Sequence, residues 1–303
     1  RITLRNGDTF TLGPPELKAV VKITYLDPPP VYMRILRYGL YGTGSVLGLL
    51  LLAILAESTR INVKTLPDAN GPVMVYAENL EEPLRPPKVG AHKDLANLTD
   101  FSTYLPKALI ASEDSRFYWH FGVDPWGVRR AIVVGRQQGK LTQGASTLTQ
   151  QVARSLFRSY VGSEDNLARK AREAVVALKL ETAYSKDKIL LTYLNRVFLG
   201  DDAHGFEDAA QHYLGKSARD LTLPDAAMLV GILPGPNIFN PCVEDKQGRK
   251  GMRAIERRNL VLTRMLETGV ITPAEARDAR RSTLNYRQEA CTPSSNTKAP
   301  YLY

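Results

Sequence analysis

Two carboxylates and a histidine stand close together in the segment ASEDSRFYWHFGVD, among aromatic residues. Glu113, Asp114 and His120 are of the types that transfer protons in enzymes. An acid that lies against aromatic side chains is partly desolvated, and desolvation raises the pKa of a carboxyl group towards neutrality. An acidic helix end beside a stripe of core aromatics has the same sequence and is commoner. This segment alone leaves both interpretations open.

A second segment, GASTLTQQVARSLF, gathers hydroxyl and amide side chains within one or two turns. Such an array can hold sugar hydroxyls or phosphate oxygens. The alternative is a capped helix start that is followed by an amphipathic turn. The polar residues of this segment are Ser146, Thr147, Thr149, Gln150 and Gln151.

A third segment, ARKAREAVVALKLE, sets one carboxylate beside two cations. Arg169 lies four residues before Glu173 and Lys170 lies three before it, so all three share one face of a helix. The pattern is typical of a surface salt-bridge ladder, which stabilises a helix little. It is equally the pattern of an acid held beside cations that bind a diphosphate.

The elements that must position these residues are mainly helices. Asp124-Pro125 combines an N-cap with proline at the first helical position. Residues 165–184 hold neither Gly nor Pro and predict a long helix. Ser185 caps a further predicted helix that Gly200 ends, and Thr272 to Glu275 form a capping box. The sequence therefore predicts a mainly α domain over residues 95–285.

The composition of the 303 residues is that of a folded protein, with 44% hydrophobic and 23% charged residues. This length accommodates one or two domains. The 4 His are scattered and the 2 Cys cannot form a cysteine-rich zinc module, so no metal-ligand spacing is present. The net charge of +9 favours an anionic partner but does not say which kind.

A membrane span is predicted where the chain runs from Tyr38 to Ala56 without a charged residue. As a helix, this stretch covers about 28 Å, close to the roughly 30 Å hydrocarbon core of a bilayer. A buried soluble helix of this length usually carries a polar stripe, and a signal peptide has an apolar core of only ~7–15 residues. Arg34 and Arg37 precede the span, so the positive-inside rule places the N-terminus in the cytoplasm. This orientation argues against a nucleic-acid partner.

The residues before the span predict β structure. Asn6-Gly7 is flanked by ITLR and DTFTL, and this pattern indicates a β-hairpin with a two-residue turn. A proline run at residues 28–30 then breaks the chain. We predict that residues 1–30 are a small β-rich cytoplasmic segment, a fragment of a larger module.

In this order, the three chemical segments resemble those of the peptidoglycan glycosyltransferases of family 51, the glycan-polymerising domain of class A penicillin-binding proteins. The first motif is Glu-Asp-x-x-Phe-x-x-His-x-Gly-x-Asp, the second is Gly-x-Ser-Thr-x-Thr-Gln-Gln, and the third is Arg-Lys-x-x-Glu. Two further blocks follow, and the resemblance runs from about residue 100 to residue 266. The five matched blocks begin at Glu113, Gly144, Arg169, Tyr193 and Ala226.

The resemblance implies a lysozyme-like, two-lobed helical fold, one lobe of which has an apolar surface that dips into the outer leaflet. It implies lipid II as the substrate, a disaccharide-pentapeptide carried on undecaprenyl diphosphate. Glu113 would be the general base for the acceptor sugar, and Glu173 would lie across the cleft near the donor sugar. Arg154, Arg169 and Lys170 would bind the diphosphate. The other residues implied at the substrate are Asp114, Phe117, His120, Ser146, Thr147, Gln150, Gln151 and Asn195.

The resemblance also implies partners and a location. It implies no tightly bound cofactor, and it allows a divalent cation, Mg²⁺ or Mn²⁺, at the diphosphate. The expected partners are lipid II, the growing glycan strand, membrane lipid and other proteins of cell-wall synthesis. The expected location is the inner (plasma) membrane, with one span, a cytoplasmic N-terminus and a periplasmic or extracellular catalytic domain.

Four positions depart from the usual family pattern. Position 154 is Arg where Lys is usual, and position 165 is Asp where many members have Arg. Position 191 is Leu where Glu is usual, and position 202 is Asp where Gly is frequent. These changes bear on diphosphate affinity and processivity more than on the reaction, so we expect an active enzyme. The alternative is a catalytically weakened membrane scaffold. A third interpretation is a lytic glycosidase, which would need no diphosphate site.

The predicted organisation has five parts. Residues 31–58 form the transmembrane helix, residues 59–94 lead into the domain at 95–285, and residues 286–303 begin a linker towards a transpeptidase domain. Cys242 and Cys291 lie on the oxidising side of the predicted span. A disulfide between them would contribute about 4 kcal/mol in the chain-entropy model, and two unpaired thiols are the alternative.

Overall fold

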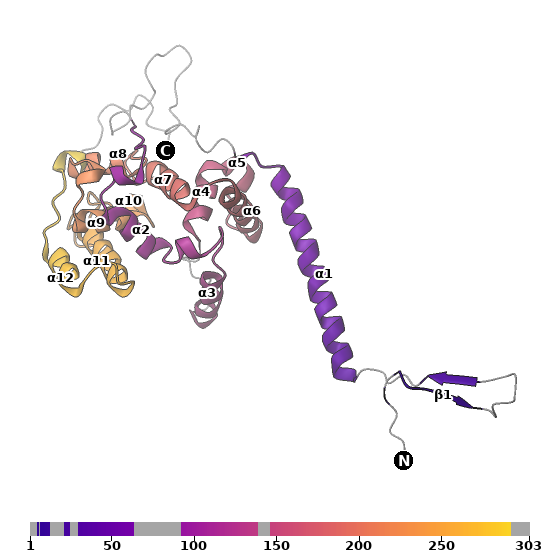
Figure 1. Cartoon of the computed structure of the whole chain (residues 1–303). Coiled ribbons are helices and arrows are strands. Elements are labelled where there is room, and N and C mark those ends of the chain that lie inside the picture. The colour runs from indigo at the N-terminus through magenta and orange to yellow at the C-terminus, as the bar shows by residue number, and fades with distance from the viewer. Residues whose placement is uncertain are drawn as a thin grey trace, which may run out of the picture. The chain divides into compact units, whose positions relative to one another are not determined.

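The computed structural model describes residues 5, 7–12, 21–24, 30–63, 92–138 and 146–291. The chain forms two compact units, Arg1–Glu57 and Ser58–Tyr303, and each is described by itself (Figure 1).

The first unit contains two short strands. Strand β1 (Thr9–Leu12) pairs antiparallel with β2 (Val21–Thr24), so that Thr9 lies opposite Thr24. Ahead of β1, the Asp8 N–H donates to the Arg5 carbonyl at 3.0 Å and Gly7 has a φ of 93°, as expected for an Asn-Gly turn. The strand predicted before this turn lies largely outside the described residues. The structure pairs β1 with β2, which the sequence analysis did not predict.

Helix α1 (Val31–Thr59) follows and matches the predicted span at 31–58. It is long and apolar enough to cross a membrane, and its most apolar window has no buried residues within the protein. Its exposed apolar side chains include Tyr38, Leu47 and Leu52. Such surface is stable in lipid and costly in water.

The described part of the second unit is mainly helical, as predicted (Figure 1). Its elements are η2 (Leu98–Asp100), α2 (Tyr104–Glu113), η3 (Phe117–Trp119), α3 (Pro125–Gln138), α4 (Leu148–Leu156), α5 (Arg158–Val161), α6 (Leu167–Ala183), α7 (Lys186–Arg196), α8 (Phe206–Leu214), η4 (Ala218–Asp220), α9 (Leu223–Ile232), α10 (Pro236–Phe239), α11 (Met252–Glu267), α12 (Pro273–Arg281) and η5 (Gln288–Cys291).

Helix α9 is the centre of one part of the core. It is apolar on all sides and nearly all of it is buried, because α2 and α11 pack against it. A side chain at Gly231 would meet the backbone of Arg257 at 2.9 Å, so glycine is what allows α11 to approach α9 this closely. The α2–α9–α11 contact places the end of α2, and therefore Glu113, on a rigid support.

Helices α4, α6 and α7 form a second packed group. The predicted caps hold, since the side chains of Ser185 and Thr272 accept from backbone N–H groups at the starts of α7 and α12. Asn166, which the sequence analysis did not single out, caps α6. Helix α7 ends at Arg196, before the predicted stop at Gly200, because Val197 is already extended.

A disulfide joins Cys242 to Cys291, with the two Cα atoms 5.0 Å apart. This decides between the two alternatives that the sequence left open. The closed loop contains both α11 and α12.

Candidate active site

Glu113 is the last residue of α2, and its side chain is half-buried. Each of its carboxylate oxygens faces one uncharged donor. The Ser112 hydroxyl donates to Oε1 at 3.4 Å, and the Gln151 amide donates to Oε2 at 3.4 Å. Both distances are at the long end for hydrogen bonds, as is common for catalytic groups in the absence of substrate.

Each of the two donors, Gln151 and Ser112, accepts a hydrogen bond from a further residue. The Tyr193 hydroxyl of α7 donates to Gln151 Oε1 at 2.9 Å. Arg264 of α11 donates through Nη1 to the Ser112 carbonyl at 2.8 Å and to the Ser112 hydroxyl at 3.1 Å. Burial, together with the charge of Glu113, raises the pKa of Tyr193 well above its ordinary value, so this phenol remains a donor at neutral pH.

Glu173 is the second carboxylate, and it has no exposed surface. Its Oε1 accepts from Arg154 Nε at 2.7 Å, and its Oε2 accepts from Lys170 Nζ at 2.8 Å. Arg169 forms a further short ion pair with Oε1. Burial acts to raise the pKa of Glu173, but the hydrogen bonds and charges of Arg154 and Lys170 outweigh it, so the pKa lies below its ordinary value.

The three cations around Glu173 differ in exposure. The side chain of Arg169 is buried, and it also pairs with Asp165. The side chain of Arg154 is 46% exposed and that of Lys170 is 40% exposed. Lys170 Nζ also donates to the Ser146 hydroxyl at 2.8 Å. Two cations therefore present positive charge to solvent while the third holds the carboxylate from within. The arrangement is a buried cluster and not the surface ladder that the spacing alone permitted.

Helix α4 connects the two carboxylates. Gln151, beside Glu113, and Arg154, beside Glu173, are three residues apart and therefore lie on one face of this helix. Its start is fixed by a capping box in which Thr147 Oγ1 accepts from the Gln150 N–H at 3.1 Å and Gln150 Oε1 accepts from the Thr147 N–H at 3.0 Å. For these two residues the structure supports the capped-helix interpretation.

Asp114, His120 and Phe117 pack and bond within the protein next to the site. The Asp114 carboxylate accepts from His120 Nε2 at 2.9 Å and from the Leu148 N–H at 3.0 Å, so it ties the loop after α2 to the start of α4. Phe117 is fully buried, and Lys186 Nζ lies 4.5 Å from the centre of its ring. These side chains are occupied within the protein, and their contact with substrate stays a prediction.

Asn195 is also occupied within the protein. Its amide donates to the Leu95 carbonyl at 2.9 Å and accepts from the Leu95 N–H at 3.1 Å. Ser112, Tyr193 and Arg264 were not among the predicted site residues. Tyr193 stood in the fourth matched block, which was a usable signal, whereas the spacing of Arg264 from Ser112 gives none.

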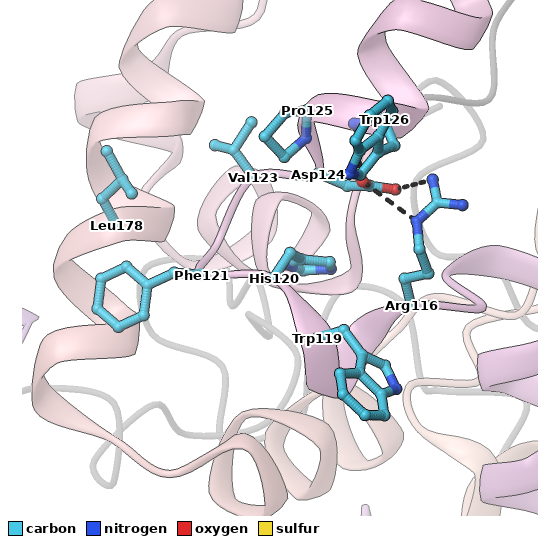
Figure 2. A pocket seen from close by; sticks show the side chains of 9 residues that line it. All are labelled: Arg116, Trp119, His120, Phe121, Val123, Asp124, Pro125, Trp126 and Leu178. Atoms are coloured by element: carbon cyan, nitrogen blue, oxygen red, sulfur yellow. Dashed lines mark hydrogen bonds and ion pairs between the residues drawn. The ribbon is translucent and has the colours of Figure 1, made fainter.

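The aromatic residues after Glu113 do not form a common wall around it. Only Phe117 is buried, while Trp119 is 88% exposed and Trp126 is 64% exposed. The two tryptophans line a separate hollow of about 470 Å³, where Leu178 of α6 faces the loop (Figure 2). The hollow is lined by Arg116, Trp119, His120, Phe121, Val123, Asp124, Pro125, Trp126 and Leu178.

One ion pair lies in the wall of this hollow. Arg116 Nη2 lies 2.5 Å from Asp124 Oδ2, and Asp124 also accepts from the Trp126 N–H at 3.1 Å (Figure 2). Burial acts to raise the pKa of Asp124, but the bond from Arg116 and a backbone N–H outweigh it, so the pKa is lowered. The pair fixes the start of α3.

With this geometry in hand, the chain was compared with known proteins. The family model described as Transglycosylase matches residues 82–266. The chain belongs to the transglycosylase family. This confirms the family predicted from the motifs, and the matched region contains both carboxylates.

Relatives of this transglycosylase include penicillin-binding protein 1A of Neisseria flavescens, 43% identical over 196 residues, which are 65% of this chain and 23% of the relative. Penicillin-binding protein 1A of Aquifex aeolicus is 42% identical over 182 residues, 60% of this chain and 24% of the relative. A crystal structure of penicillin-binding protein 1A from Haemophilus influenzae is 24% identical, with a TM-score of 0.38, and covers 66% of this chain and 19% of that one. The chain thus spans about a quarter of the length of the curated relatives it matches.

Proposed function

We propose that this domain is a peptidoglycan glycosyltransferase that polymerises lipid II into glycan strands, with inversion at the donor sugar. The observation that carries the proposal is the pair of carboxylates that one face of α4 contacts, through Gln151 at Glu113 and through Arg154 at Glu173. One carries uncharged donors and the other organises a cluster of cations. A transfer that moves a proton at one end and releases a diphosphate at the other needs both kinds of site.

In the proposed reaction, Glu113 is the general base. Its carboxylate takes the proton of the acceptor sugar's 4-hydroxyl while that oxygen attacks the anomeric carbon of the donor chain. The bond between the anomeric carbon and the diphosphate oxygen breaks with both electrons on the oxygen, and undecaprenyl diphosphate leaves. A positioned base contributes roughly 10²–10⁴-fold to such a step.

The charge that grows on the leaving diphosphate is stabilised by Arg154 and Lys170, the two cations of the cluster that reach solvent. Glu173 holds these cations in place and its pKa is lowered, so we assign it no proton transfer. Ser146 fixes Lys170 by accepting from its ammonium group.

We route no step through a divalent cation. Among the described residues no group of three His, Cys, Asp or Glu side chains is arranged to hold a metal ion. The oxygens of Glu173, the carboxylate nearest the proposed diphosphate site, are already taken by Arg154, Arg169 and Lys170. A cation at the diphosphate would therefore take its ligands mainly from the substrate.

The membrane completes the proposal. We infer that α1 spans the inner membrane with the N-terminus in the cytoplasm, and that the second unit is a two-lobed, lysozyme-like domain outside it. Trp119, Phe121 and Trp126 are candidates for the surface that meets the outer leaflet, because exposed aromatics favour the interface between lipid and water.

The test is polymerisation of labelled lipid II in detergent by the native chain and by Glu113→Gln. We expect long glycan strands from the native chain and almost none from the variant, at equal thermal midpoints of unfolding. A native chain that folds and binds lipid II without making polymer would contradict the proposal and favour a scaffold. Cleavage of preformed glycan would favour a lytic enzyme, and equal activity in both proteins would remove Glu113 as the base.

A further inference from the structure

We propose that Tyr193 and Arg264 are positioning residues for Glu113, each acting through the one donor that it holds. The inference rests on the proposed function, because it assumes that Glu113 is the base. Two chains of hydrogen bonds hold the carboxylate, and we call them together the bracket. In the first arm Tyr193 holds Gln151, which donates to Oε2 of Glu113. In the second arm Arg264 holds Ser112, which donates to Oε1.

The first arm fixes the direction of an amide. A glutamine side chain can turn over and exchange its oxygen and its NH₂ group, and either end fits the same space. The Tyr193 hydroxyl donates to the oxygen end of Gln151 at 2.9 Å, which leaves the NH₂ end for Glu113. Tyr193 is buried and remains protonated, so it can donate to this oxygen at neutral pH, while the ionised carboxylate of Glu113 can only accept and therefore takes the NH₂ group.

The second arm fixes the direction of a hydroxyl. Arg264 donates to the oxygen of the Ser112 side chain at 3.1 Å and occupies one of its lone pairs. The hydrogen of that hydroxyl is then directed elsewhere, and Glu113 Oε1 is its partner. The bond from Arg264 to the Ser112 carbonyl, at 2.8 Å, also holds the last turn of α2.

The two neighbouring arginines, both among the residues that the structure describes, donate no hydrogen bond to Glu113, although the charges of Arg257 and Glu113 attract each other. Arg264 reaches Glu113 through Ser112, and Arg257 donates to the Gly231 carbonyl at 2.9 Å and covers the Phe239 ring. In the described parts of the chain, the hydrogen bonds to Glu113 come from uncharged groups. A carboxylate held in this way keeps its direction.

Two conservative variants test the bracket. Tyr193→Phe removes only the hydroxyl, and Arg264→Lys keeps the charge but removes the planar fork. We expect either change to slow turnover about three- to tenfold, the range for one hydrogen bond. We also expect the acidic limb of the pH–rate profile to move to higher pH, because the donor that favours the charged form of the carboxylate is no longer held in place. The lipid II concentration at half-maximal rate stays unchanged.

Matched controls lie in the same helices or the same core. Tyr213→Phe also deletes a buried hydroxyl, which donates to the Leu199 carbonyl at 3.0 Å. Arg258→Lys alters another arginine of α11, which donates to the Ser282 carbonyl at 2.9 Å. We expect these controls to lower the thermal midpoint without moving the pH–rate profile. Equal kinetic effects in controls and test variants would overturn the proposal.

Double-mutant cycles decide whether each residue acts through its donor. In a Gln151→Ala background, Tyr193→Phe should cost no further turnover, and in a Ser112→Ala background Arg264→Lys should cost little more. The same cycles are measured in thermal midpoints, which need no activity. If the losses of the two single variants add up in the double variant, in rate and in thermal midpoint, the bracket is overturned. If the native chain makes no polymer, the proposed function is overturned. The cycles in thermal midpoint then still show whether Tyr193 is coupled to Gln151 and Arg264 to Ser112.

Discussion

Glu113 and Glu173 both contact the same face of α4, and they are held in opposite ways. Glu173 is fully buried and has three cations as partners, so its charge is compensated and its pKa is lowered. Glu113 is half-buried and accepts from uncharged donors. The difference teaches that residue type did not decide the two roles. The surroundings lower the pKa of Glu173 with charged partners and hold Glu113 with uncharged ones.

The largest expected contrast is in stability. Glu173→Gln removes the buried one of the two carboxylates that pair with Arg169, and breaking a buried ion pair costs about 3–5 kcal/mol. Glu113→Gln keeps the side chain's shape and removes no ion pair, so we expect a change within about 1 kcal/mol. Unfolding of both full-length variants in one detergent, followed by tryptophan fluorescence, measures the contrast. Equal destabilisation would remove the distinction between the two sites.

Acid sharpens the same contrast. Because the pKa of Glu173 is lower in the folded chain than its ordinary 4.5, its ionised form adds stability above about pH 4.5. That contribution is lost as the pH falls through the lowered pKa. We expect the thermal midpoint of the native chain to decrease as the pH is lowered below about 4.5. The thermal midpoint of Glu173→Gln should decrease less steeply over the same pH range. Asp124 has a lowered pKa as well, so part of the slope remains in the variant.

Arg154 tests whether the cation cluster works through charge or through shape. Arg154→Lys retains the positive charge beside Glu173, and we expect at least about a third of the native turnover, since loss of one modest hydrogen bond changes a rate a few-fold. Arg154→Met should slow turnover at least tenfold, because the growing charge on the diphosphate loses a partner. Initial rates of lipid II polymerisation measure both. Equal rates in the two variants would show that this charge is not used.

The smallest expected effect is at Ser146. Ser146→Ala removes one of the two partners of Lys170 Nζ but leaves the bond to Glu173 in place. We expect the half-saturating lipid II concentration to rise about two- to fivefold with an unchanged maximal rate, as for a hydrogen bond that contributes about 1 kcal/mol or less. A fall in maximal rate alone would assign Ser146 to the transition state instead.

Much of the helical framework was predictable, because local signals specify it. Ser185 and Thr272 occupy the cap positions that their sequences predict, and the apolar stretch before residue 57 became one long helix. The hairpin partner of β1 was not found, since pairing across a longer connection leaves no mark in the turn itself. Strand pairing depends on contacts that are distant in the sequence.

The site was predictable in its membership and not in its arrangement. The spacing of Arg169, Lys170 and Glu173 placed them on one face, but burial of that face depends on α4, which supplies Arg154 from another segment. The bond from Arg264 to Ser112 joins residues 152 positions apart. No local pattern encodes such a contact, because it exists only once α11 packs against α2.

The disulfide between Cys242 and Cys291 links this site to the chemistry of the compartment in which the chain matures. The closed loop contains α11, the helix that supplies Arg264. In a reducing medium the unfolded loop is unconstrained, and α11 must order itself at an entropic cost that the bridge would have removed. In the proposed location outside the membrane, an oxidising space would therefore also help to assemble the surroundings of Glu113, and a chain purified with a strong thiol reductant lacks that step.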